Sequence, residues 1–144
     1  MNQVQRVTTP QVAEPATATW SNALRMGQEL VMSGMTAHPA SRQAAEAGQP
    51  LGAYAQTLVV LEKIRHLLEA AGGHAGNLYK LVIYVTDIAD KDEVGRARRD
   101  FFEGFAHYPA STLVAVSALV FSELNVEIDA SACLGIDLRL AQES

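Results

Sequence analysis

The sequence predicts a single α+β domain in which two helices cover one face of a mixed sheet. One long segment repeats its apolar residues at helical spacing, and several short runs alternate apolar and polar residues as strands do. Because the two kinds of segment interleave, the predicted order is β-β-α-β-α-β-β, within residues 20–138. A chain of 144 residues can bury the core of one such domain. We expect an irregular N-terminal arm at 1–19 and a C-terminal tail at 139–144.

The first half of the domain is predicted to contain a hairpin over 20–35 and a long helix over 51–71. Gly27-Gln28 separates two short apolar runs, which is the pattern of a two-residue turn. Residues 36–50 are small or turn-forming, and we expect a loop there. The helix ends before Gly72-Gly73, and its apolar positions recur every three or four residues: Leu58, Leu61, Ile64, Leu68 and Ala71.

The second half is predicted to contain a strand over 78–86, a helix over 91–106 and two further strands. Pro109 ends the helix region. The last two strands, 111–119 and 125–134, are expected to pair as a hairpin. Because 111–119 carries apolar residues on both faces, we expect another subunit to cover one face of the sheet.

Composition excludes several classes of function. The net charge is −5 and the isoelectric point is about 5.3, without a basic run, which argues against a nucleic-acid-binding protein. A single cysteine, Cys133, forms no intrachain disulfide and indicates a reducing compartment. No apolar run approaches the roughly 20 residues of a membrane helix, and no secretory signal is evident. We therefore expect a cytoplasmic protein without a membrane partner. The histidine spacing predicts no metal site, and we expect no cofactor.

Several segments, taken in order, resemble the YjgF/RidA family, which is also known as the endoribonuclease L-PSP family. The similar segments span roughly 20–134 and are Leu30-Val31-Met32-Ser33-Gly34, Gln56-Thr57 with Ala70-Ala71-Gly72, Val85-Thr86-Asp87, Phe101-Phe102 with Pro109-Ala110, and Val126-Glu127-Ile128-Asp129. The resemblance implies a chorismate-mutase-like fold and a homotrimer with a barrel-like core. It also implies small-molecule clefts between subunits. In the deaminase branch of the family, these clefts hydrolyse imines and enamines made by pyridoxal-phosphate enzymes.

The chain departs from the family at the residue that binds the substrate carboxylate. The family motif is Pro-Ala-Arg-Ser, whose arginine pairs with the carboxylate in a bidentate manner. This chain has Pro109-Ala110-Ser111-Thr112, so Ser111 replaces the arginine. The loss of a charge-assisted hydrogen bond costs about 1.5–3 kcal/mol. Leu113 and Trp20 also replace the usual cysteine and tyrosine, so we expect a more apolar and less anion-selective cleft.

The resemblance and the residue types together give a set of candidate site residues. Glu127 matches the family's strand glutamate, and the resemblance implies that it positions a water; its alternative role is a solvated or subunit-facing carboxylate. The candidate substrate-binding residues are Ser111, Thr112, Trp20, His107 and Gly34. For His107 the alternative is an exposed histidine at a helix end, and for Trp20 it is packing. Arg98 and Arg99 are either a compensating cation or ordinary surface charge.

Three functions follow from this set. The first is a divergent RidA-type hydrolase or deaminase that acts on a small imine or enamine between subunits of a homotrimer. The second is a trimer of the same fold that binds a small ligand without turnover. The third is the ribonuclease or translation-inhibitor activity suggested by the L-PSP name, which the acidic isoelectric point disfavours.

Overall fold

A computed structural model of the chain describes residues 3–140 and 142–144; residues 1, 2 and 141, from the predicted arm and tail, lie outside it. Its centre is a six-stranded mixed sheet with strand order β1-β2-β3-β6-β4-β5. The β4–β5 pair is parallel and the other pairs are antiparallel. The strands are β1 (Val4–Val7), β2 (Ala23–Met26), β3 (Glu29–Met32), β4 (Leu78–Val85), β5 (Ala110–Ala115) and β6 (Val126–Cys133). The prediction of a mixed α+β fold is confirmed.

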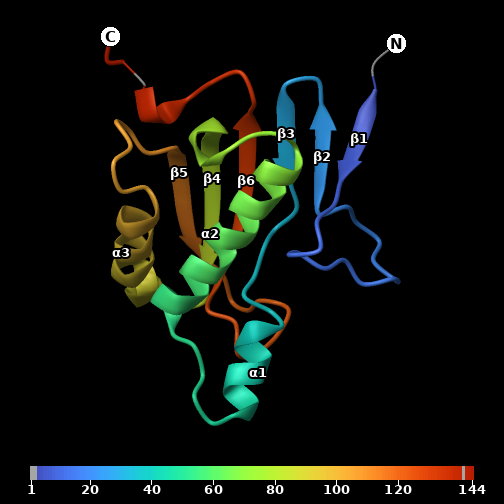
Figure 1. Ribbon diagram of the computed structural model, residues 1–144. Helices are drawn as coiled ribbons and strands as arrows, with labels where there is room; N and C mark the ends of the chain where they lie inside the picture. The colour runs from blue at the N-terminus through green and yellow to red at the C-terminus, as the bar shows by residue number, and fades with distance from the viewer. Residues whose placement is uncertain (1–2, 141) are drawn as a thin grey trace.

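Two helices, α2 (Ala53–Ala70) and α3 (Lys91–Phe101), lie side by side on one face of this sheet (Figure 1). Helix α2 forms where the sequence repeats apolar residues at helical spacing, and Leu61, Ile64 and Leu68 are completely buried. It ends before Gly72, whose φ of 87° only glycine adopts without strain. No helix in the described ranges is both long and apolar enough to cross a membrane.

The N-terminal region is more regular than the predicted arm. The hairpin of β2 and β3 turns at Gly27-Gln28 as expected, with Gly27 at a φ of 63°. However, residues 4–7 form β1, which extends this hairpin by pairing with β2. The segment Val4-Gln5-Arg6-Val7 is too short and too polar to be recognised as a strand on its own, and the exposed edge of β2 supplies its hydrogen-bonding partners.

The predicted loop at 36–50 contains a short helix, α1 (Ala40–Glu46). This helix lacks a side-chain cap, and a tertiary contact secures it: Arg42 Nε donates to Glu123 Oε1 at 2.6 Å. The guanidinium of Arg42 also lies 4.6 Å from the centre of the Phe121 ring. The prediction of a loop was wrong because tertiary contacts stabilise a helix that has little intrinsic signal.

Helix α3 ends at Phe101 and not at 106 as predicted. Phe102 turns into the core, where its ring packs edge-on against Phe101 and Phe105. Gly104 then takes a φ of 85°, which is incompatible with a continuing helix. The aromatic residues at helical spacing therefore mark a packed turn and not a further helical turn.

The predicted hairpin between 111–119 and 125–134 was wrong. Strand β5 ends at Ala115 and pairs in parallel with β4, while β6 lies between β3 and β4. The unit β4–α3–β5 is a crossover, and such units place their two strands in parallel. In Figure 1, β5 is accordingly the far edge of the sheet from β1.

The other face of the sheet carries a mixture of apolar and polar side chains. Along β6, the even-numbered residues are buried beneath the helices, whereas the odd-numbered residues from Glu127 to Cys133 are half-buried on this second face. We call this second face the open face. It also carries Val31, which is 42% exposed, and Val114, which is 41% exposed.

A buried amide joins α2 to the connection between β5 and β6. The Nε2 of Gln56 lies 2.8 Å from Leu51 O, 2.9 Å from Glu123 O and 2.7 Å from Asn125 Oδ1. Gln56 Oε1 accepts a hydrogen bond of 2.8 Å from Asn125 N. Gln56 is fully buried. If its amide were removed, water could not reach its hydrogen-bonding partners to take its place.

We expect the substitution Gln56→Leu to lower the free energy of unfolding by about 3 kcal/mol or more, because it leaves several buried polar groups unpaired at nearly constant volume. Denaturant unfolding at one fixed protein concentration measures the change. Gln43→Leu, at an exposed position of α1, is the control and should change stability by less than about 0.5 kcal/mol. Equal effects of the two substitutions would contradict this role of Gln56.

Candidate functional site

Glu127 and Gly34 lie together on the open face of the sheet. Gly34 follows β3, and its neighbour Met35 bridges β6 through two backbone hydrogen bonds with Ile128, of 2.9 and 3.0 Å. A Cβ atom at Gly34 would overlap Glu127 Oε2 and would lie 2.9 Å from Asp129 Oδ1. Position 34 therefore requires glycine because the carboxylates of β6 occupy the space of a side chain.

The carboxylate of Glu127 lies in an environment that favours its protonated form. Burial raises the pKa of Glu127 above its usual value, and the negative charge of Asp129 raises it further. Asp129 accepts a hydrogen bond of 3.1 Å from the Tyr84 hydroxyl. A carboxyl group with a raised pKa, half-buried on a sheet, has the properties of a general base.

Thr112 also lies on the open face, at the edge strand β5. Its Oγ1 accepts a hydrogen bond of 2.9 Å from Lys80 Nζ. In the parallel register, Thr112 pairs with Val82, which pairs with Asp129 on its other side. Thr112, Val82 and Asp129 therefore form one row across the open face, and Lys80 brings a positive charge to this row.

Ser111 points to the opposite face of the sheet from Glu127. It pairs with the buried residue Leu81, whose side chain lies beneath the helices. Its hydroxyl accepts a hydrogen bond of 2.8 Å from Arg98 Nη1 of α3. Within one chain, Glu127 and Ser111 therefore lie on opposite faces of the sheet.

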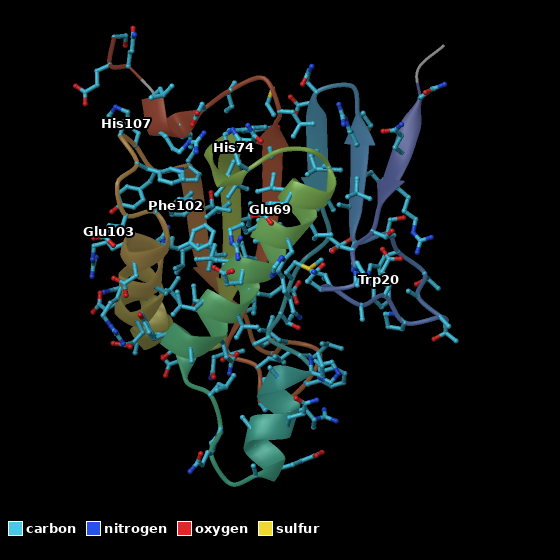
Figure 2. All side chains as sticks on the ribbon, in the orientation of Figure 1. Trp20, Glu69, His74, Phe102, Glu103 and His107 are labelled. Atoms are coloured by element: carbon cyan, nitrogen blue, oxygen red, sulfur yellow. The ribbon has the colours of Figure 1, made fainter. Side chains whose placement is uncertain are left out.

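Trp20 and His107 lie far from each other, at opposite sides of the molecule (Figure 2). Trp20 is 52% exposed in the loop before β2. His107 lies in the connection between α3 and β5, with its Nε2 3.7 Å from Glu143 Oε1. Within a single chain, neither residue joins the group around Glu127.

Three residues of these surfaces were not predicted from the sequence: Asp129, Tyr84 and Lys80. The alternation of β6 is a signal for Asp129, since residues two apart on a strand share a face. Tyr84 and Lys80 are brought there by the β4–β6 register, which the sequence alone does not give. Among the described residues, no three His, Cys, Asp or Glu side chains are grouped as metal ligands would be.

Comparisons with known proteins agree with this architecture. The family model "Endoribonuclease L-PSP" matches residues 11–134. A crystal structure of a protein of unknown function from Pseudomonas aeruginosa is 63% identical, with a TM-score of 0.97, and the match covers 99% of this chain and all of that one. A RutC family protein of Aquifex aeolicus is 27% identical over 127 residues, which are 88% of this chain and 94% of the relative.

A third similar protein is TdcF of Escherichia coli, which is named as a candidate reactive intermediate deaminase. Its crystal structure with bound serine has a TM-score of 0.75 and is 26% identical to this chain. The match covers 90% of this chain and 98% of TdcF.

We expect the substitution Asp129→Asn to lower the pKa of Glu127, because it removes the neighbouring negative charge. The pKa should stay above the ordinary glutamate value of about 4.3, since burial, the larger cause, remains. A carboxyl ¹³C NMR titration of Glu127 measures the shift. Asp92→Asn, at an exposed position of α3, is the control. A titration midpoint that is unchanged or higher in Asp129→Asn would refute this assignment of the electrostatics.

Proposed function

The chain belongs to the endoribonuclease L-PSP family, and from this membership we propose that it is a divergent RidA-type hydrolase that deaminates a small imine or enamine. The observation that carries the proposal is the half-buried Glu127 carboxylate beside Gly34. The absence of a side chain at Gly34 allows the Glu127 carboxylate to lie against the backbone there, and burial raises its pKa, as is typical of a general base.

In the proposed reaction, Glu127 orients a water molecule and accepts one of its protons. The water oxygen adds to the carbon of the C=N bond, and the nitrogen takes up a proton. That proton is the one Glu127 accepted, so the product of addition is a neutral carbinolamine and the carboxylate is regenerated. The hydroxyl proton of the carbinolamine then moves to the nitrogen, the C–N bond breaks with ammonia as the leaving group, and a carbonyl compound remains. An enamine substrate first moves a proton to carbon to become the imine. A positioned base of this kind typically contributes about 10²–10⁴-fold to the rate.

The bound serine of TdcF supports a small substrate of amino-acid type. Serine carries both an amino group and a carboxylate on one short skeleton. An imine derived from such an amino acid keeps the carboxylate next to the reacting carbon. We therefore propose a substrate of this size and charge, with the carboxylate bound away from Glu127.

A homotrimer with clefts between subunits is part of the proposal. Within one chain, Glu127 and Ser111 lie on opposite faces of the sheet, so a site that uses both residues needs two copies of the chain. The partly exposed Val31 and Val114 provide apolar surface on the open face for such contacts. Burial of apolar surface of this kind stabilises oligomers.

We expect sedimentation to give a molar mass for the purified protein that is three times the 15.5 kDa of one chain. The substitution Val31→Lys should shift this equilibrium toward monomer, because it places a charge on the open face. Analytical ultracentrifugation at micromolar concentration measures both. Val4→Lys, at an exposed position of β1, is the control. A wild-type monomer would contradict a site between subunits.

We expect Glu127→Gln to lower the rate of imine hydrolysis at least about 100-fold, because an amide cannot accept the proton of the water. The assay measures ammonia release from 2-aminoacrylate-type imines generated in the reaction mixture. The control is Glu69→Gln, on the exposed side of α2 (Figure 2), which should retain wild-type activity. If the wild type does not accelerate hydrolysis, the protein is a ligand-binding member of the family; if Glu127→Gln remains fully active, another group supplies the base.

A further inference from the structure

A cleft of about 330 Å³ lies between α3 and the start of β5. Its lining residues are Gly95, Arg98, Arg99, Tyr108, Pro109 and Ser111. The polar side chains among them, two guanidiniums and two hydroxyls, all carry hydrogen-bond donors, and none of the lining side chains is acidic. A cleft with this lining favours a ligand that accepts hydrogen bonds and carries negative charge.

Arg98 differs from Arg96 of the same helix in its surroundings. Arg96 donates to Glu93 Oε2 at 2.7 Å and stacks 3.6 Å from the centre of the Tyr54 ring. Arg98, by contrast, forms no ion pair with an Asp or Glu in the part of the chain that the structure describes. Its position, one helical turn after the buried residue Val94, directs its side chain along the core side of α3. Arg98 is half-buried there, and this burial lowers the pKa of its guanidinium.

The hydrogen bond between Arg98 and Ser111 leaves two kinds of donor available to a ligand. The hydroxyl oxygen of Ser111 accepts from Arg98 Nη1 at 2.8 Å, so the hydroxyl hydrogen is free to point elsewhere. The guanidinium has five N–H groups, and this bond uses one of them. A planar cation and an adjacent hydroxyl donor are thus held together in the lining of the cleft.

We propose that this cleft binds a small carboxylate, with the guanidinium of Arg98 as its ion-pair partner and the Ser111 hydroxyl as a second donor. Guanidinium and carboxylate are both planar, and their spacing allows two parallel hydrogen bonds. Of the two roles considered for Arg98, this proposal takes that of a compensating cation: α3 provides the guanidinium that β5 lacks. That the bound carboxylate belongs to the substrate imine rests on the proposed function. That the cleft binds a carboxylate does not.

The binding is tested by NMR with the full-length protein and propionate as the probe. We expect saturable shifts of the backbone amides of Arg98 and Ser111 and of the Arg98 side-chain Nε–H. Inorganic phosphate is titrated in parallel as a general oxyanion, because a guanidinium also binds phosphate through two hydrogen bonds, but phosphate has no apolar group to pack against Tyr108 and Pro109. Propionate should bind more tightly than phosphate; equal or tighter binding of phosphate would overturn the assignment to a carboxylate.

Substitutions on α3 identify the arginine that binds propionate. Arg98→Gln should raise the dissociation constant for propionate by a factor of about ten or more, and Arg98→Lys should give a smaller increase, because it keeps the charge but loses the paired donors. The matched control is Arg96→Gln, two residues away on the same helix, which should bind as the wild type does. Unchanged affinity in Arg98→Gln, or shifts confined to other surfaces, would overturn the proposal.

A swap of the two side chains is a gain-of-function test. In the double variant Arg98→Ser/Ser111→Arg the guanidinium moves from α3 to β5, and propionate binding should recover relative to Arg98→Ser alone. Glu69→Gln, on the exposed side of α2, should leave propionate affinity unchanged. A wild type that binds propionate but does not accelerate imine hydrolysis would count against the proposed reaction only. A wild type that hydrolyses the imine, together with unchanged propionate affinity in Arg98→Gln, would count against the carboxylate site only.

Discussion

The parts of the chain on which the candidate site depends are held together by the buried amide of Gln56. Its hydrogen bonds fix the start of α2 and the residues that precede β6. Asn125 is hydrogen-bonded to this amide, and Glu127 follows it by two residues. The hydrogen bonds of Gln56 therefore also fix the position of the Glu127 carboxylate on the open face. The nearby ion pair between Arg42 and Glu123 fastens α1 to the same connection. Two long connections thus become ordered around one polar residue of α2.

Much of the fold could be predicted from the sequence because its main elements carry strong local signals. Helix α2 has apolar residues at regular spacing, and the β2–β3 hairpin has its glycine turn. The elements that escaped prediction are stabilised by distant contacts. Strand β1 needs the edge of β2, and α1 needs Glu123 and Phe121. For β5, the strand was predicted but its partner was not. The parallel pairing of β5 followed from the intervening helix, a topological rule that outweighs the apparent hairpin in the sequence.

The site was predictable only in part, for a similar reason. The resemblance pointed to both Glu127 and Gly34, and the Met35–Ile128 bridge brings them together. The sequence could not place Ser111 on the other face of the sheet, because the face depends on the register between β4 and β5. Nor could it separate Arg98 from the neighbouring arginines, although its distance of four residues from Val94 was a usable signal. Trp20 and His107 were proposed from alignment and proximity in sequence, and within one chain both lie away from Glu127.

The contact between Arg98 and Ser111 has a consequence for how relatives of this chain are classified. Members of a family are commonly grouped by the residue in one alignment column, here the position of Ser111. A helix that packs over that column can supply the same chemical group from a different place in the sequence, thirteen residues earlier in this chain. Two proteins can then differ at the diagnostic position and still present a guanidinium to the same space. Comparison of relatives by the positions of their charged groups in three dimensions would separate true loss of the cation from its relocation.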